Sequence, residues 1–194
     1  MNSLIIYDWD DTLFPTTYIN HNRNINKQFL LALERYNIRL LEKSRHLAQT
    51  IIITNAATEW IYMSAKQYMY RLYQYLQYTN ISVISAREYA ISKQIYNPIH
   101  WKDITFYNTI NSLINLNGNK YINNIISVGD ALYEKNALIK FGIYTHNKLN
   151  YNMYIKTIKY IDTPSIERLL YETQSLLNNI EYHIQIKQNL NITM

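Results

Sequence analysis

Short runs of apolar and β-branched residues alternate along the chain with longer segments whose apolar residues recur at helical spacing. Five runs have the length and composition of buried strands: LIIYD (4–8), TIIIT (50–54), ISVIS (81–85), NIISVGD (124–130) and MYIKTIKYI (153–161). Helices are expected over 25–47, 57–78, 101–116, 132–141 and 164–187. This alternation predicts an α/β, Rossmann-like fold with a five-stranded, mainly parallel sheet between helices.

Nothing in the sequence marks a boundary between domains. Only three glycines and three prolines occur among the 194 residues, and no repeat, linker or charge block divides them. We therefore expect a single domain over residues 1–194, long enough to bury a core. The segment 164–190 predicts an amphipathic C-terminal helix that packs on the sheet. Dimerisation through the same apolar stripe is the alternative, so both a monomer and a homodimer remain open.

Composition and charge narrow the class of protein. No stretch approaches the ~20 consecutive apolar residues of a membrane span, no signal-peptide pattern is present, and cysteine is absent. These features predict a soluble, cytoplasmic protein without disulfides, thiolate metal sites or a membrane partner. The formal net charge of +5 favours an anionic substrate or partner, but it does not distinguish a nucleic acid from a small phosphate ester.

Charged and polar residues collect where the expected strands end. In DWDDTLFPT, the carboxylates Asp8, Asp10 and Asp11 directly follow the first strand, where like charges repel and burial is costly. The later strand ends and one helix start supply further polar groups: Thr54 and Asn55, Ser85 and Arg87, Lys102, and Asp130 with Glu134. Ligands of open α/β sheets bind at the carboxyl ends of the strands, so we expect several of these side chains to converge there.

A bound cation would explain the crowded acids. Mg²⁺ prefers hard oxygen ligands from carboxylates, phosphate and water, so it relieves the repulsion within such a cluster. The Thr54 hydroxyl and the backbone N–H groups of Asn55 and Ala56, at the start of a helix, can hold phosphate oxygens. Lys102 would balance the remaining negative charge, which allows a carboxylate nucleophile to approach phosphorus.

The order of these motifs resembles that of a known superfamily. Asp8-x-Asp10-x-Thr12, Thr54, Lys102 and Gly129-Asp130 with Glu134 are similar, in this order, to the four motifs of the haloacid dehalogenase (HAD) superfamily. The wider stretches DWDDTLFPT, IITNA, ISAREY, WK and SVGD also resemble an uncharacterised branch of HAD-like proteins in microbial eukaryotes and large DNA viruses. The resemblance implies a small phosphatase-type member with a Rossmann-like HAD fold.

The resemblance also implies a role for each motif residue. Asp8 would form an aspartyl-phosphate, and Asp10 would act as the general acid and base. Thr54, Asn55 and Lys102 would bind the phosphoryl group. The Mg²⁺ ligands would be Asp8, the main-chain carbonyl of Asp10, Asp130 and Glu134, the last either directly or through water. The acid at position 10 argues for phosphoryl transfer, because the superfamily's dehalogenases lack it.

Three features depart from the family pattern or leave a choice. Glu134 stands where the family usually has Asp. Lys93 is a second candidate for the motif lysine, but Lys102 is preferred because Trp101 precedes it. The segments between the first and second motifs and between Ala56 and Lys102 leave no room for a folded cap. An open site would admit a large phosphorylated substrate, such as a phosphoprotein or a nucleic-acid end.

The functional prediction is therefore an Mg²⁺-dependent phosphomonoester hydrolase. The alternatives are a catalytically weak HAD-fold binding or scaffold module and a nucleic-acid-end phosphatase. Nucleic-acid contact has weak support from AKQYMYRLYQYLQY, in which aromatic residues alternate with two cations. Helical spacing more plainly indicates that this stretch and the residues before it form a buried face, made of Trp60, Met63, Tyr70 and Tyr73.

Overall fold

The computed structural model describes residues 2–116, 122–149 and 153–194. In these residues it contains one sheet of six parallel strands in the order β3-β2-β1-β4-β5-β6. The strands are β1 (Ser3–Tyr7), β2 (Gln49–Thr54), β3 (Ser82–Ser85), β4 (Asn124–Gly129), β5 (Tyr154–Lys159) and β6 (Leu190–Thr193). The predicted α/β architecture with a parallel sheet between helices is thus confirmed.

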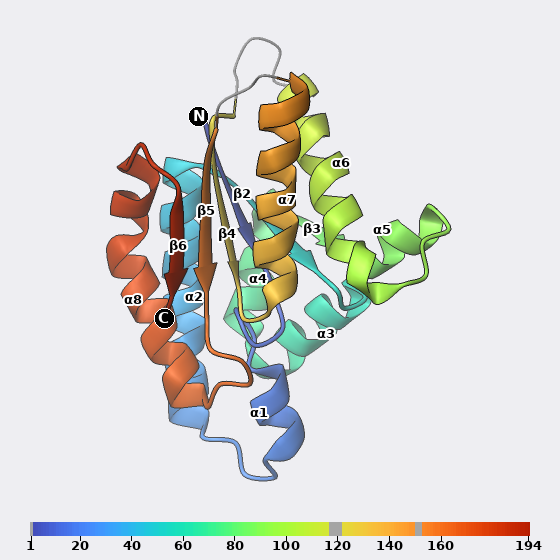
Figure 1. Cartoon of the computed structure of the whole chain (residues 1–194). Coiled ribbons are helices and arrows are strands. Elements are labelled where there is room, and N and C mark those ends of the chain that lie inside the picture. Colours follow the sequence, from blue (N-terminus) through green and yellow to red (C-terminus); the bar gives the residue numbers. More distant parts are fainter. Residues whose placement is uncertain (1, 117–121, 150–152) are drawn as a thin grey trace.

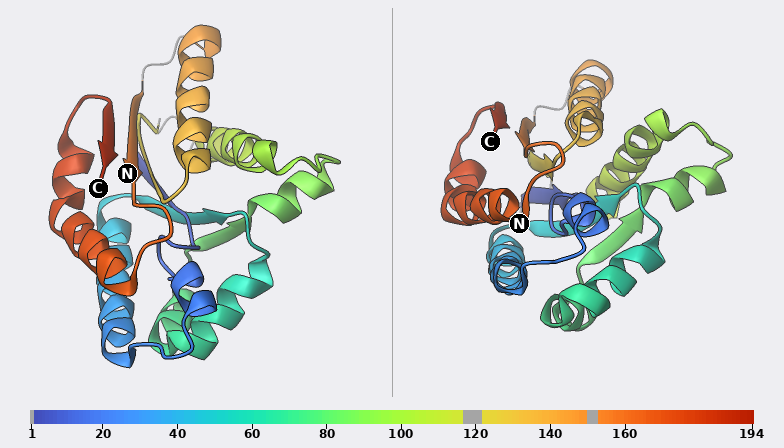
Figure 2. Two further views of the ribbon diagram at one scale, coloured as in Figure 1. Left: turned by 60° about the horizontal axis from the view of Figure 1, so that its bottom comes forward. Right: turned by 90° about the horizontal axis from the view of Figure 1, so that it is seen from below.

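Helices cover both faces of the sheet (Figures 1 and 2). One face is covered by α2 (Lys27–Leu47), α3 (Thr58–Tyr68), α4 (Tyr70–Tyr78) and α8 (Ile166–Gln185), and the other by α5 (Ala86–Ser92), α6 (Trp101–Leu116) and α7 (Leu132–Leu149). A single turn of 3-10 helix, Pro98–His100, precedes α6. The short helix α1 (Thr16–His21) lies at the carboxyl ends of the strands, in front of the sheet in the right view of Figure 2.

The alternating side chains of β1 show how the sheet separates two apolar cores. Ile5 and Tyr7 pack with the side chains of α2, α4 and α8, whereas Leu4 and Ile6 pack with those of α6 and α7. Successive strand residues point to opposite faces, so a fully apolar run such as LIIY fits a strand buried on both sides. The sequence prediction of a central buried strand is therefore confirmed at β1.

The C-terminal region differs from the sequence prediction. The expected helix over 164–190 begins at Ile166, after the Ser165 side chain accepts a hydrogen bond from the Arg168 N–H, and it ends at Gln185. The chain then turns and adds β6 in parallel to β5, which gives six strands where five were expected. The buried Lys156 ammonium donates to the carbonyls of His183 and Ile186, at the C-terminal end of α8, at distances of 2.5 and 2.6 Å. A four-residue strand has too little periodicity to be recognised from sequence.

The expected helix over 57–78 is divided into two. Met69, with φ of −137°, breaks the helical conformation between α3 and α4 and changes the phase of the side chains. Met63 and Tyr70 are 54% and 55% exposed, so the prediction that both belong to a buried face is wrong. Trp60 and Tyr73 do pack against the core. Across the described parts of the chain, the helices are too short or too polar to span a bilayer.

Candidate active site

The strand order has its switch point at the carboxyl ends of β1 and β4. Chain connections run outward in both directions from this pair, and such a switch point is where open parallel sheets bind ligands. Asp8 follows β1 directly, and its N–H donates to the Val128 carbonyl of β4 at 2.9 Å. Asp130 follows β4 directly. The topology therefore brings two acids that are far apart in sequence to one edge of the sheet.

A tight turn after β1 sends the three acids of DWDDTLFPT in different directions. The Trp9 carbonyl accepts from the N–H groups of Leu13 and Phe14, both at 2.9 Å, and Asp11 takes a left-handed conformation with φ of 51°. Asp is one of the few residues besides glycine that tolerate this conformation. The Asp11 carboxylate then accepts from the N–H and the hydroxyl of Thr17 in α1. Asp11 thus stabilises the loop, while Asp8 lies buried at the carboxyl end of β1.

Lys102 neutralises part of the acid cluster from inside the protein. Its ammonium contacts Asp8 Oδ1 at 2.7 Å, Glu134 Oε1 at 2.9 Å and the Ile53 carbonyl at 2.5 Å, and only 1% of the residue is exposed. Burial alone would lower the pKa of Lys102, but the two carboxylates outweigh it and raise that pKa. Lys93 instead lies exposed over the Tyr89 ring, at 5.8 Å. Of the two lysines considered, Lys102 is the one beside the acids.

Three carboxylates form a group that fits a divalent cation. Asp8, Asp130 and Glu134 each offer an oxygen, and these oxygens lie within 4.8 Å of one another. Lys102 supplies one ammonium beside these three carboxyl groups, and the buried Glu134 Oε2 has no hydrogen-bond partner. A Cβ on Gly129 would lie 2.6 Å from Glu134 Cγ, so glycine makes room for this arm. An excess of buried, hard oxygen donors fits Mg²⁺.

The pKa values of two of these acids reflect the uncompensated charge. Burial raises the pKa of Asp8 from 3.8 to about 7, with Glu134 adding to the shift and Lys102 opposing it. Burial, Asp8 and Glu134 raise the pKa of Asp130 from 3.8 to about 8. Because the folded state holds these protons more tightly than the unfolded chain, the free energy of unfolding of the metal-free protein falls as the pH rises through this interval.

We therefore expect Mg²⁺ to stabilise the protein more at about pH 8.5 than at about pH 6, since protons compete with the ion for the same oxygens. Thermal melting with Mg²⁺ or with chelator at both pH values measures this difference. Asp130→Asn should remove most of the Mg²⁺-dependent rise in Tm, whereas Glu42→Gln, a change at an exposed acid on α2, should preserve it. An equal Mg²⁺-dependent rise in Tm at both pH values would contradict competition between Mg²⁺ and these protons.

The Asp10 carboxylate lies outside the metal-binding group. Oδ1 accepts from the hydroxyl of Thr16 and from the indole N–H of Trp60, the latter at 2.9 Å, and Oδ2 accepts from Thr54 Oγ1 at 3.3 Å. This placement agrees with the expectation that Asp10 would contact Mg²⁺ only through its main-chain carbonyl. The helical pattern predicts that Trp60 is a core residue, and Thr16 is not among the predicted site residues. An indole reads as apolar in a periodicity pattern, although its N–H is a donor.

The turn after β2 carries the expected phosphate-binding residues. The Thr54 hydroxyl is 1% exposed and accepts from the Ala56 N–H at 3.1 Å, so it lies between this turn and Asp10. Asn55 Oδ1 is buried without a hydrogen-bond partner. Thr54 does not cap α3, whose N-cap residue is Ala57. The segment 54–57 therefore presents a hydroxyl, an amide side chain and backbone groups beside the acids.

The end of β3 forms a separate set of contacts. The Ser85 hydroxyl accepts from the Glu88 N–H at 3.1 Å, and Glu88 accepts from both the N–H and the hydroxyl of Thr58. The Arg87 guanidinium is exposed and lies over the Trp101 ring at 5.9 Å. Arg87 thus lies against Trp101, while Glu134 pairs with Lys102. Ser85 and Glu88 hold α5 against the start of α3.

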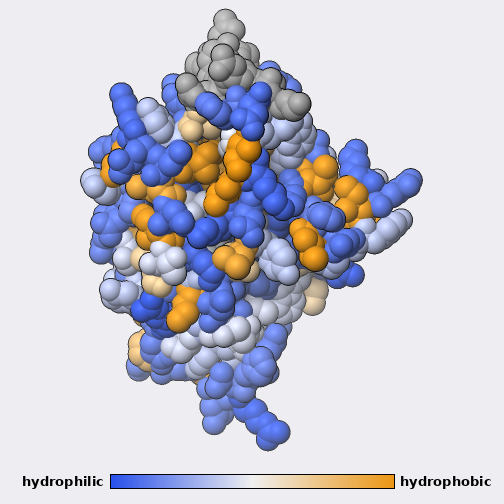
Figure 3. All heavy atoms as spheres, viewed as in Figure 1, coloured by the Kyte–Doolittle hydropathy of each residue, from blue (hydrophilic) through white to orange (hydrophobic). Residues whose placement is uncertain are grey.

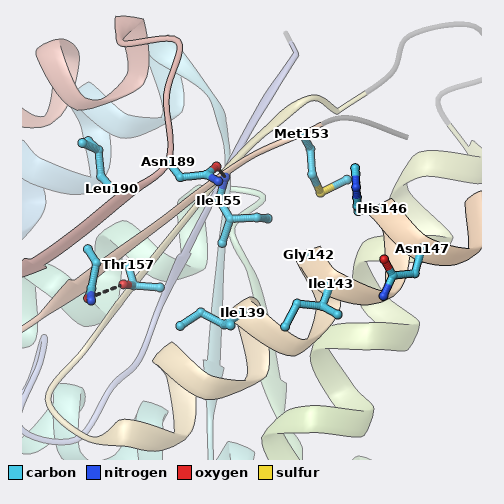
Figure 4. Close-up of a pocket in the computed structure, with 11 residues that line it drawn as sticks. Ile139, Gly142, Ile143, His146, Asn147, Met153, Ile155, Thr157, Asn189 and Leu190 are labelled. Carbon is cyan, nitrogen blue, oxygen red and sulfur yellow. Dashed lines mark hydrogen bonds between the residues drawn. The ribbon is translucent and has the colours of Figure 1, made fainter. Parts of the chain in front are cut away.

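A separate hollow lies away from the acids. Apolar side chains gather on the surface (Figure 3) where a pocket of about 610 Å³ opens between α7 and strands β5 and β6 (Figure 4). Ile139, Ile143 and Ile155 line it together with the hydrogen-bonded pair Thr157 and Asn191. Among the described residues that line it, none carries a carboxylate, an ammonium or a guanidinium group. Candidate chemistry therefore lies at the acid cluster rather than in this pocket.

Comparisons with protein-family models, with curated proteins and with solved structures found no match for this chain. Support for a function accordingly comes from the site alone. The site is the set of contacts that joins the ends of β1, β2 and β4 to the first turn of α6 and the first turn of α7.

Proposed function

We propose that the protein is a HAD-like, Mg²⁺-dependent phosphomonoester hydrolase that forms an aspartyl-phosphate on Asp8. The observation that supports this most strongly is the Lys102 ammonium, which contacts both Asp8 and Glu134 while Asp130 completes a group of three acids. A nucleophilic carboxylate beside a fixed cation and a divalent-cation site is suited to attack on a phosphate dianion. The sheet has six strands rather than the expected five. The placement of the motif residues at the strand ends agrees with the four HAD motifs that the sequence resembles.

The proposed reaction has two steps. In the first, an Asp8 carboxylate oxygen forms a bond to phosphorus, the bond from phosphorus to the leaving oxygen breaks, and the Asp10 carboxyl gives its proton to that oxygen. In the second, Asp10 takes a proton from water as the water oxygen attacks phosphorus, and the bond to Asp8 breaks. The products are an alcohol and inorganic phosphate, and both Asp8 and Asp10 return to their starting states.

The remaining residues would bind and orient the phosphoryl group. The Thr54 hydroxyl and the backbone N–H groups after β2 can donate to its oxygens. All three Lys102 N–H donors already have partners, so Lys102 acts chiefly as a fixed positive charge unless one of these contacts exchanges for a phosphate oxygen. Asp8, Asp130 and Glu134, with the main-chain carbonyl of Asp10, would hold Mg²⁺. When bound, Mg²⁺ supplies charge neutralisation on the phosphoryl oxygens.

Release of phosphate from a generic aryl phosphate tests the proposal. We expect wild-type protein to turn the substrate over with Mg²⁺ and to lose that activity when a chelator is added. Readdition of Mg²⁺ should restore it. If turnover with Mg²⁺ is no higher than the uncatalysed rate across phosphorylated peptides, nucleotides, sugars and oligonucleotide ends, the fold serves as a binding or scaffold module and the proposed activity is wrong.

Asp10→Asn should lower kcat by about 10²- to 10⁴-fold, the usual contribution of a general acid and base. Mg²⁺ binding should change little, because the Asp10 side chain lies outside the three-acid group. Phosphate release measures the first quantity, and the Mg²⁺-dependent rise in Tm measures the second. Equal loss of turnover and of Mg²⁺ stabilisation would contradict this division of roles.

A further inference from the structure

We propose that Trp60 is a positioning residue that fixes which oxygen of Asp10 exchanges protons with the substrate. This inference depends on the proposed phosphatase activity and assigns to it a residue outside the four motifs. The Trp60 indole N–H lies 2.9 Å from Asp10 Oδ1. An indole N–H can only donate a hydrogen bond, whereas the hydroxyls of Thr16 and Thr54 can both donate and accept.

The contacts of the two Asp10 oxygens are unequal. Oδ1 has two partners, the Trp60 indole N–H and the Thr16 hydroxyl, whereas Oδ2 has the Thr54 hydroxyl at the longer distance of 3.3 Å. With Oδ1 occupied by Trp60 and Thr16, Oδ2 is the oxygen left for proton exchange, on the side of the expected phosphate-binding turn. Oδ2 then delivers the proton to the leaving group and later receives one from water.

The Trp60 ring is held firmly enough to impose this choice. Phe14, from the turn after β1, packs against it edge to face, with ring centroids 6.1 Å apart and an interplanar angle of 87°. The main-chain N–H of Trp60 donates to the Ala57 carbonyl at 3.0 Å, in the first turn of α3. Thr58 in the same turn is bonded through its N–H and hydroxyl to Glu88. The donor therefore has a fixed place relative to β1 and β2.

Trp60→Phe tests the inference, because it removes the N–H and keeps an aromatic ring. We expect kcat/KM for phenyl phosphate, whose leaving group needs a proton, to fall about 10- to 100-fold, a partial loss of general-acid catalysis. For 2,4-dinitrophenyl phosphate, whose leaving group needs none, kcat/KM should fall less than about threefold. Trp101→Phe is the matched control: its indole N–H donates to the Ile95 carbonyl, and we expect both substrates to be nearly unaffected.

A double-mutant cycle separates a positioning role from a structural one. If Trp60 acts through Asp10, Trp60→Phe should change turnover of phenyl phosphate less than about twofold in the Asp10→Asn background. Equal loss for both substrates, no loss for either, or a full additional loss in the Asp10→Asn background would each overturn the inference. If Trp60→Phe does not fold, Trp60→Met takes its place, because methionine adapts to an irregular space and also lacks the N–H.

Failure of the inference differs from failure of the proposed function. Active wild-type protein with an unselective Trp60→Phe variant would overturn only the role of Trp60. Wild-type protein that hydrolyses neither aryl phosphate with Mg²⁺ would overturn the phosphatase activity, and the role of Trp60 with it.

Discussion

Asp8→Asn is expected to reduce kcat for an aryl phosphate by at least about 10³-fold, because the amide cannot form the acyl phosphate that splits the reaction into two steps. The substitution keeps the size and shape of the side chain. It removes one of the two carboxylates that contact Lys102, and the ammonium still contacts Glu134 and the Ile53 carbonyl. The variant should therefore fold, so its loss of activity reports on chemistry rather than on structure.

Steady-state phosphate release and the melting temperature together measure this effect. Glu42→Gln is the control, since Glu42 is an exposed acid on α2 and its replacement also changes a carboxylate to an amide. A second measurement identifies the nucleophile directly. Asp10→Asn, which lacks the base for the second step, should accumulate a phosphate adduct on the peptide that contains Asp8. A folded Asp8→Asn variant as active as wild type would exclude Asp8 as the nucleophile and favour another mechanism.

Lys102→Met is expected to be the most destabilising of the substitutions considered. It leaves Asp8 and Glu134 buried without their cation, and loss of one partner from a buried ion pair typically costs about 3–5 kcal/mol. Activity should also fall, because no fixed positive charge remains beside the nucleophile. Urea unfolding measures the change in the free energy of unfolding, and Lys93→Met, at an exposed lysine, is the matched control.

The acid cluster also predicts how Mg²⁺ affects the stability of Lys102→Met. Without the ammonium, three carboxylates share the site, so Mg²⁺ should recover more stability in Lys102→Met than it adds to the wild type. Unfolding in chelator and in Mg²⁺ compares the two. The double variant Lys102→Met/Glu134→Gln should lose less stability than the two single variants lose in total. The second change removes a charge that the first leaves unpaired. Strict additivity would contradict direct coupling between the two residues.

Most of the fold could be predicted from sequence where the periodic signal is long. β1 and β2 contain the buried apolar runs LIIY and III, and α2 and α6 have helical spacing over their whole lengths. The short helices α1 and α5 were not predicted, and two other differences arise where a local event interrupts the pattern. Met69 divides one expected helix into two, and the turn after α8 starts a strand of only four residues. Neither event leaves a periodic trace, because backbone conformation changes within one or two residues.

The candidate site shows a similar division. Strand-end acids, Thr54 and Lys102 could be selected from sequence because carboxyl ends of parallel strands share one edge. Asp11 was grouped with the other acids, and only the left-handed turn shows that it bonds to α1 instead. Trp60 could not be selected, because a helical pattern treats it as an apolar residue and its N–H becomes informative only when Asp10 lies 2.9 Å away.

By itself, the sequence determined which chemical groups are available and near which strand ends they lie, because apolar periodicity fixes the strands and the chain order fixes the residues that come after each of them. Tertiary structure decided which of those groups meet. Lys102 is 94 residues from Asp8 in the chain, yet it contacts Asp8 and Glu134 at once. That contact depends on the order of strands in the sheet and on the packing of α6 and α7, which many distant residues determine together.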